Sequence, residues 1–150
     1  MINWECLPFS ELTIDEFHDL LALRIKVFVV EQNCPYQEVD GKDKCSFHLI
    51  GRDSSGKIVG TLRILPKGIS YDEVSIGRVV LDETVRGNGC GHQMMKEALS
   101  FCKIKFGPSP IVLSAQKHLE KYYNHHQFVS TGKEYLEDGI PHVEMRFIPK

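Results

Sequence analysis

The clearest capacity for chemistry in this sequence lies in one glycine-rich run, Arg86-Gly87-Asn88-Gly89-Cys90-Gly91. An apolar run rich in Val and Ile precedes it and an amphipathic stretch follows, so we expect it to join a buried strand to a helix. Glycine lets the backbone approach a ligand closely, and a helix N-terminus offers unpaired N–H groups and a partial positive charge. The run therefore indicates a phosphate-binding loop, to which Arg86 could add a charge-assisted bond. A tight turn that needs glycine for geometry alone is the alternative.

Two common phosphate-binding motifs do not fit this loop. A P-loop requires Gly-Lys-Ser/Thr, which does not follow the glycines here. A dinucleotide fingerprint has a different glycine spacing and an acidic residue on a second strand, which is also missing. The pattern that remains is Arg-x-x-Gly-x-Gly between a strand and a helix.

The surrounding chain alternates strand and helix patterns that would hold this loop in place. The first helix has a capping box at Thr13 and Glu16 and a hydrophobic staple formed by Leu12 and Phe17. A polar connection with Pro35 and Gly41 follows it, over residues 31–45. We expect strands over residues 2–9, 47–52, 58–65, 74–81, 111–115, 128–136 and 142–148, and helices from residue 14 towards 28, over 91–106 and over 119–126. The strand, helix and strand between residues 74 and 115 predict a right-handed parallel crossover, hence an α/β fold with a mixed sheet in a single domain over residues 1–150.

Composition narrows the classes of function. The chain has 150 residues, 42% of them hydrophobic and 25% charged, with a formal net charge of −2 and a pI near 6.4. No basic field is present to attract nucleic acid or an anionic membrane, and the N-terminus lacks the pattern of a signal peptide, so we expect a cytoplasmic protein with neither partner. The five cysteines include no C-x-x-C pair and the seven histidines no ligand set, which argues against disulfides and a bound metal.

The glycine-rich loop and its flanking elements resemble the GNAT superfamily of N-acetyltransferases, whose pyrophosphate loop has this pattern. The resemblance extends along most of the chain. Three segments, FVVEQNCPYQEVD from Phe28, IGRVVL from Ile76 and EDGIPHVEM from Glu137, are similar to the ElaA-like subgroup of that superfamily.

The resemblance implies a fold and a set of binding residues. The fold would be a mixed sheet of six to seven strands in which the parallel strands 4 and 5 splay apart. The backbone of Val79, Val80 and Leu81 would bond the pantetheine arm of acetyl-CoA, and the loop would wrap the pyrophosphate. That loop comprises Arg86, Gly87, Asn88, Gly89, Cys90 and Gly91.

The resemblance also implies a chemical role for one tyrosine. Tyr123 matches the tyrosine of the family's Phe-Tyr-x-x-x-Gly-Phe segment and would protonate the departing CoA thiolate. Its neighbour Tyr122 would face elsewhere on the same helix, and we expect it to take no part. Gln127 stands where that segment usually has glycine.

The sequence offers several candidates for the general base. The candidates His48 and His142 come first because imidazole titrates near neutral pH. Glu31, Glu137 and Asp138 are further candidates, and an alkyl amine could also lose its proton through water.

The implied activity is acetyl transfer from acetyl-CoA to a primary amine of a small molecule or peptide. Four acidic residues of the long connection suit a cationic amine, although a solvated surface loop is the alternative: Glu31, Glu38, Asp40 and Asp43. A CoA-binding sensor or interaction module on the same fold is the rival function. A homodimer is as compatible with the sequence as a monomer.

Overall fold

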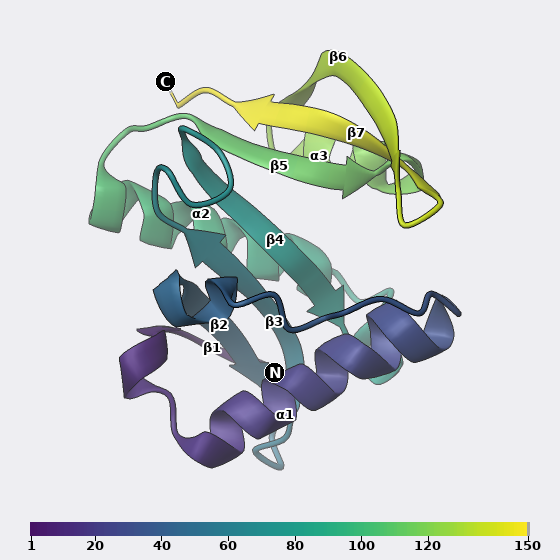
Figure 1. Ribbon diagram of the computed structural model, residues 1–150. Coiled ribbons are helices and arrows are strands. Elements are labelled where there is room, and N and C mark those ends of the chain that lie inside the picture. The colour runs from purple at the N-terminus through teal and green to yellow at the C-terminus, as the bar shows by residue number, and fades with distance from the viewer. Residues whose placement is uncertain (150) are drawn as a thin grey trace.

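A computed structural model describes residues 1–149, which form one seven-stranded mixed sheet with helices on both faces (Figure 1). The strand order is β1-β2-β3-β4-β5-β7-β6, and β4 and β5 are the parallel pair. The predicted mixed sheet with parallel fourth and fifth strands is confirmed. The strands are β1 (Asn3–Pro8), β2 (Phe47–Arg52), β3 (Ile58–Leu65), β4 (Val74–Leu81), β5 (Ile111–Gln116), β6 (Phe128–Glu137) and β7 (Ile140–Phe147), and the α-helices are α1 (Ile14–Ile25), α2 (Cys90–Phe106) and α3 (Glu120–His125).

Helix α1 begins where its sequence signal places it. Thr13 Oγ1 accepts a hydrogen bond from the Glu16 N–H at 3.0 Å, and Glu16 Oε1 accepts from the Thr13 N–H at 2.9 Å. This reciprocal pair satisfies two amide donors that the first turn would otherwise leave unpaired. The helix continues past Ile25 as the π-helix η2 (Lys26–Glu31), which the apolar periodicity does not reveal.

The two faces of the sheet carry separate apolar cores. On β2, Leu49 packs in the cluster that includes Met94 and Met95 of α2, whereas Ile50 packs in the cluster that includes Leu20 of α1. Successive strand residues point to opposite faces, so one strand serves both cores. Figure 1 accordingly shows α1 and α2 on opposite sides of the sheet.

Glycines on β2 and β3 make room for an indole. A Cβ on Gly51 would lie 2.5 Å from the Trp4 ring, and one on Gly60 would lie 2.8 Å from Leu81 and 3.0 Å from Trp4. Trp4 on β1 therefore lies flat against these two strands.

The turn of the β6–β7 hairpin is shorter than the sequence predicts. Asp138 and Gly139 both have positive φ, 51° and 77°, and Glu137 pairs directly with Ile140. This two-residue connection matches the twist of the flanking strands, so β7 begins at Ile140 and not at His142.

Candidate active site

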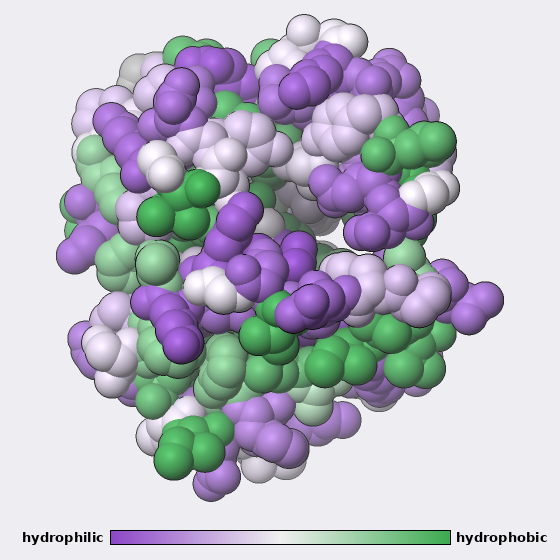
Figure 2. Space-filling model, viewed as in Figure 1, coloured by the Kyte–Doolittle hydropathy of each residue, from purple (hydrophilic) through white to green (hydrophobic). Residues whose placement is uncertain are grey.

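A cavity opens where β4 and β5 separate. The two strands pair only at Val74 with Ile111 and at Ser75 with Val112, so both strands have free edges beyond these pairs. The cavity has a volume of about 1110 Å³ and extends from this gap to the start of α2 and to the β6–β7 turn. The gap separates two halves of the molecule, one that contains β1 to β4 and one that contains β5 to β7. In Figure 2 the surface is hollowed between these halves, with hydrophilic residues along one edge of the hollow.

A bulge on β4 shapes the floor of this cavity. Thr61 pairs with Val80 and Arg63 pairs with Gly77, so Arg78 and Val79 together face a single residue of β3. Arg78 has φ of 53°, a conformation that non-glycine residues adopt at a cost of roughly 1 kcal/mol. Both Arg78 and Val79 line the cavity. Gly77 lines the cavity, and a Cβ built on it would meet nothing within 4 Å.

The glycine-rich loop leaves the N-terminus of α2 without a side-chain cap. Gly89 is the N-cap with φ of 77° and no side chain to bond the first turn. The first helical bond runs from the Gln93 N–H to the Gly89 carbonyl, so the N–H groups of Cys90, Gly91 and His92 have no helical acceptor. Gly87, Gly89 and Gly91 line the cavity, and Cβ atoms on Gly87 or Gly89 would meet nothing within 4 Å. These groups suit a pyrophosphate.

The Arg86 side chain fastens this loop to the rest of the molecule. Its Nε donates to the Leu81 carbonyl at 3.0 Å, and its two terminal nitrogens each lie 3.1 Å from the Glu31 carboxylate at the end of η2. Glu31, a candidate base, therefore pairs with an arginine at the cavity wall. Arg86 has fewer donors free for a phosphate than the sequence suggests.

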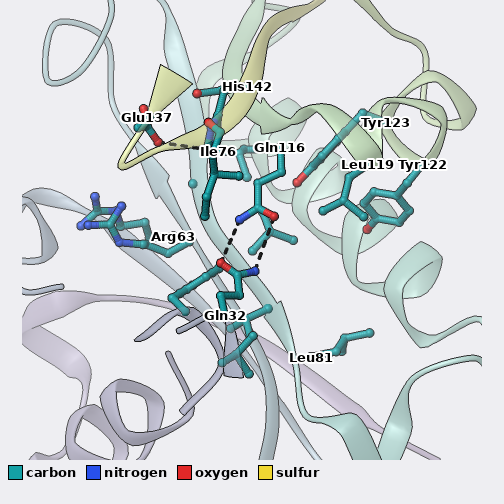
Figure 3. A pocket seen from close by; sticks show the side chains of 18 of the residues that line it. Gln32, Arg63, Ile76, Leu81, Gln116, Leu119, Tyr122, Tyr123, Glu137 and His142 are labelled. Atoms are coloured by element: carbon teal, nitrogen blue, oxygen red, sulfur yellow. Dashed lines mark hydrogen bonds and ion pairs between the residues drawn. The ribbon is translucent and has the colours of Figure 1, made fainter. Parts of the chain in front are cut away.

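The adjacent tyrosines of α3 occupy different positions at the cavity. Figure 3 shows the Tyr123 hydroxyl pointing into the cavity, and within residues 1–149 it bonds no other group. Tyr123 is 4% exposed, and burial, with the neighbouring Tyr122 second, raises the pKa of its phenol. The phenol therefore stays protonated at neutral pH.

Tyr122 has a structural contact of its own. Its hydroxyl donates to the Gly91 carbonyl at 2.5 Å, which ties α3 to the first turn of α2. The turn that ends α3 forms with Gln127 at φ of 70°, which explains why a glycine is typical there.

His142 and Glu137 lie together at the β6–β7 end of the cavity (Figure 3). His142 Nδ1 donates to the Ile140 carbonyl at 2.7 Å, so in the neutral ring Nε2 carries the lone pair. That Nε2 lies 3.4 Å from Glu137 Oε2. A proton taken up by Nε2 would be shared with a carboxylate.

His48 lies apart from the cavity, on β2 beneath α1. Its Nε2 donates to the Asp43 carbonyl at 2.9 Å, and its ring packs against Phe9 and Phe17. His48 is 1% exposed, and burial lowers its pKa, an effect that the Asp43 contacts only partly offset. The structure therefore gives His48 a packing role, away from the other candidate residues.

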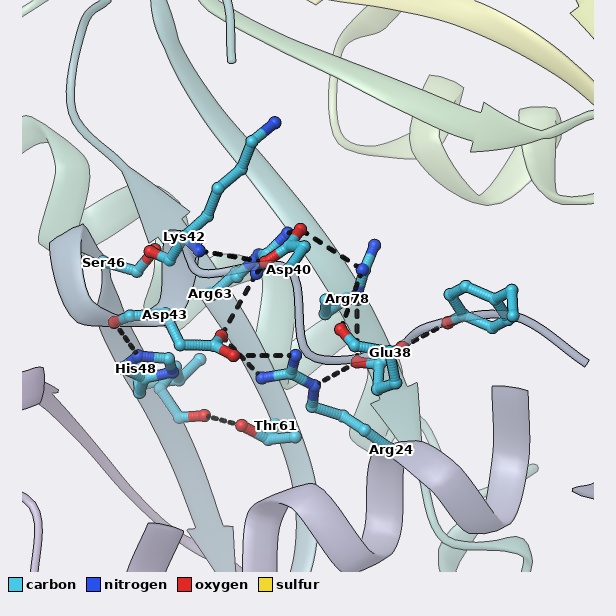
Figure 4. A network of polar contacts seen from close by, with 12 residues as sticks. Arg24, Glu38, Asp40, Lys42, Asp43, Ser46, His48, Thr61, Arg63 and Arg78 are labelled. Atoms are coloured by element: carbon cyan, nitrogen blue, oxygen red, sulfur yellow. Dashed lines mark hydrogen bonds and ion pairs between the residues drawn. The ribbon is translucent and has the colours of Figure 1, made fainter. Parts of the chain in front are cut away.

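A network of three arginines and three carboxylates (Figure 4) contributes Arg63, Arg78 and Asp40 to one wall of the cavity. Buried Arg24 of α1 bonds Glu38 at 2.5 Å and Asp43 at 2.8 Å. We define this arginine–carboxylate network by its six members: Arg24, Arg63, Arg78, Glu38, Asp40 and Asp43.

The network binds three of the four acidic residues of the connection over residues 31–45. Hydrogen bonds from Arg63 come first among the contacts that hold the pKa of Asp40 well below its usual range. Burial alone would raise the pKa of Asp43, but Arg24 and then Arg63 lower it overall. The sequence-based expectation that Glu38, Asp40 and Asp43 are free to attract a cationic amine is therefore wrong. The one sequence signal for this network is Arg24, a charged residue on the apolar face of α1.

Two amides join the halves of the molecule across the cavity. Gln32, after η2, and Gln116, at the end of β5, bond each other reciprocally, with N···O distances of 3.5 and 3.1 Å. Figure 3 shows this pair spanning the cavity. Close by, Cys34 Sγ donates to the Asp138 carbonyl at 3.6 Å. Neither contact has a local sequence signal.

Comparison with known proteins identifies the family of this site. The Acetyltransferase (GNAT) domain model matches residues 17–149. Protein ElaA of Escherichia coli (strain K12) is 41% identical over 147 residues, which are 97% of this chain and 95% of ElaA. The chain belongs to the GNAT acetyltransferase family. The predicted similarity to the ElaA-like subgroup is confirmed.

Solved structures agree with the GNAT assignment. An acyl-CoA N-acyltransferase from Pseudomonas aeruginosa is 44% identical, with a TM-score of 0.92 and coverage of 98% of this chain and 99% of that one. The crystal structure of Escherichia coli ElaA is 40% identical, with a TM-score of 0.91 and the same coverage. The splayed parallel strands are thus part of a GNAT acyltransferase fold.

The GNAT fold brings most of the predicted site residues to one cavity. Asn88 and Cys90 belong to the glycine-rich loop but do not line the cavity. The predicted residues that line it are Val79, Val80, Leu81, Arg86, Gly87, Gly89, Gly91, Tyr123 and His142.

Proposed function

We propose that this protein is an acetyl-CoA-dependent N-acetyltransferase that moves an acetyl group directly to a primary amine of a small molecule or peptide. The observation that carries the proposal is the course of the cavity. Its lining joins the start of α2, where N–H groups are unpaired, to the edge of β4 that β5 leaves free and to Tyr123 and His142.

The residues present fit acetyl-CoA. The open space at Gly87 and Gly89 admits a pyrophosphate against backbone N–H groups, and the free edges of β4 and β5 offer backbone groups to a pantetheine arm. Open space at Gly77 continues this path past the β4 bulge. When bound, acetyl-CoA supplies an acetyl group activated as a thioester.

Different side chains of the cavity carry out the two proton transfers. His142 Nε2 accepts the proton of the acceptor amine, and Glu137 stabilises the resulting imidazolium through the 3.4 Å contact. Tyr123, held protonated by its burial, donates its phenolic proton to the leaving thiolate. The backbone at the β4 bulge lines the cavity and would stabilise negative charge on the carbonyl oxygen.

Calorimetry tests the cofactor half of the proposal. We expect acetyl-CoA and CoA to bind far more tightly than ATP. Gly89→Val should abolish this binding because a β-branched side chain obstructs backbone approach to phosphate. Gly56→Val is the matched control, since Gly56 also has a strongly positive φ and open space around it but lies in the β2–β3 turn, away from the cavity.

A transfer assay tests the chemical half. The protein is incubated with acetyl-CoA and a panel of primary amines, polyamines, amino acids and peptides, and acetylated product and free CoA are measured by mass spectrometry. This readout avoids thiol reagents, which would react with the free cysteines. Product formation supports the proposal, whereas tight CoA binding with no product from any amine favours the binding module.

We also propose that the protein acts in the cytoplasm. All five cysteines are free, as is usual for chains kept in a reducing compartment. No helix within residues 1–149 combines the length and apolarity needed to span a membrane.

The same residues contain no group of three His, Cys, Asp or Glu side chains arranged to hold a metal ion.

A further inference from the structure

The wall of the cavity formed by the arginine–carboxylate network is not neutral on the side that faces the cavity. Of the six members, Arg63, Arg78 and Asp40 line the cavity, whereas the other three lie behind them. Lys42 lines it as well, and its Nζ bonds only the neutral Ser70 hydroxyl, at 2.9 Å. Within the network three arginines balance three carboxylates, so Lys42 gives this wall a net positive charge.

That carboxylate has no capacity left for a ligand. Asp40 Oδ1 accepts from Arg63 Nη1 at 2.8 Å and from the Lys42 backbone N–H at 3.0 Å. Its Oδ2 accepts from Arg63 Nη2 at 2.6 Å and from Arg78 Nη2 at 3.4 Å. An ionised carboxylate offers about four acceptor positions, and protein donors occupy all of them. Asp40 is therefore unavailable to an ammonium group.

Donors, in contrast, remain unused on this wall. Arg78 donates through Nε and Nη2, and its Nη1 bonds no other group of the described chain. Lys42 extends away from the carboxylates in Figure 4 and keeps donors beyond its bond to Ser70. Unpaired donors and excess positive charge at one wall favour an anionic acceptor of hydrogen bonds.

The wall formed by the β6–β7 turn has the opposite charge. Glu137 and Asp138 line the cavity there, next to His142. The Cys34 bond to the Asp138 carbonyl links this turn to the chain that leads into the network. A cationic wall thus faces the same cavity as an anionic one.

From these two walls we infer that the acceptor is an amine that also carries a carboxylate, a substrate of the amino-acid class. The inference rests on the proposed function. The carboxylate binds the unused donors of Lys42 and Arg78, and the amine lies towards Glu137 and His142. This arrangement would present the nitrogen at the β4 bulge and would reject amines that lack the anion, because the donors would stay unpaired.

Matched pairs of acceptors test the inference. Each of the standard amino acids is compared with its C-terminal amide, which keeps size and amine and removes the negative charge. We expect the better substrates to show kcat/KM at least tenfold above their amides. Lys42→Met should lower kcat/KM for the amino acid about tenfold more than for the amide. Lys44→Met is the control, since Lys44 is exposed on the same short helix η3 (Lys42–Cys45) and does not line the cavity.

Equilibrium binding distinguishes failure of this inference from failure of the proposed function. Binding of each amino acid and its amide to the CoA complex is followed by saturation-transfer NMR. Amides that are acetylated as well as the acids would overturn the inference while the transferase proposal stands. Amino acids that bind selectively without transfer would do the reverse, and a CoA complex that binds neither member of any pair would overturn the inference.

Discussion

Tyr122 and Tyr123 show how one helical position separates two tasks. The Tyr123 hydroxyl points into the cavity and has no protein partner among residues 1–149, whereas the Tyr122 hydroxyl bonds the Gly91 carbonyl. The first group is free to act on a ligand, and the second fixes the turn that offers N–H groups to it.

Tyr123→Phe should lower kcat by roughly 10²- to 10⁴-fold with a nearly constant Kd for acetyl-CoA. The change removes the proton donor and keeps the ring that packs against Phe128. Steady-state kinetics with the best acceptor, combined with calorimetry for acetyl-CoA, measures both quantities. An unchanged kcat would mean that the thiolate leaves without a tyrosine acid.

Tyr122→Phe should give a different signature. Loss of the bond to Gly91 loosens the first turn of α2, so the Kd for CoA should rise severalfold while kcat at saturation changes little. The same two measurements distinguish the variants. A large fall in kcat for Tyr122→Phe without one for Tyr123→Phe would show that Tyr122, and not Tyr123, is the acid.

Sheet glycines serve either packing or ligand access, according to their neighbours. Gly51 lies under the Trp4 ring, and Gly77 faces open space in the cavity. Neither role follows from the glycine itself, because both residues lie on strands of the same sheet.

Gly51→Ala and Gly77→Ala should therefore have opposite consequences. The Gly51 Cβ would meet rigid indole atoms at 2.5–2.8 Å, which should cost about 1–3 kcal/mol of unfolding free energy. The Gly77 Cβ fits the unliganded fold, so stability should hold, while acetyl-CoA binding and kcat/KM fall because the side chain occupies the slot. Thermal denaturation and calorimetry of both variants check this. Tight acetyl-CoA binding by Gly77→Ala would place the ligand elsewhere.

Local signals predicted the elements, whereas distant pairings escaped them. The capping box of α1, the glycine-rich loop and the strand positions depend on residues within a few positions of one another. The structure has them where the sequence indicates, apart from β7, which begins two residues earlier. The bonds of Glu38 join residues 14 and 40 positions apart, and the β4 bulge depends on register with β3. His48 carries no sequence mark of its place under α1, so its burial could not be predicted.

At the scale of the whole molecule, the cavity lies between two halves that few polar contacts connect. The Gln32–Gln116 pair and the Cys34 bond to Asp138 cross it, and β4 and β5 share only two paired positions. Ligand binding along this gap should therefore add contacts between the halves, and bound CoA should raise the melting temperature.

Acid should destabilise the whole fold in two successive ranges of pH. Burial first, then the charges of His92, His125 and Lys96, lower the pKa of His126 from 6.5 to about 4. The pKa of Asp82 is lowered from 3.8 to about 2, because bonds from Thr84 and Lys26 outweigh its burial. In both cases the unfolded chain binds protons at higher pH than the folded one, so stability falls as pH falls.

His126→Gln should remove the upper range and leave the lower one. The stability associated with neutral His126 is complete above pH 6.5 and is lost as pH falls towards 4, where the folded protein also becomes protonated. The variant should lose less unfolding free energy than the wild type between pH 6.5 and 4, and the two should decline in parallel below pH 4 as Asp82 is protonated. Urea denaturation at half-unit pH intervals measures this difference. His18→Gln is the control for replacing a histidine, because His18 is exposed on α1. Parallel wild-type and His126→Gln curves from pH 6.5 to 4 would show that the contacts between His126, His92 and His125 do not oppose protonation.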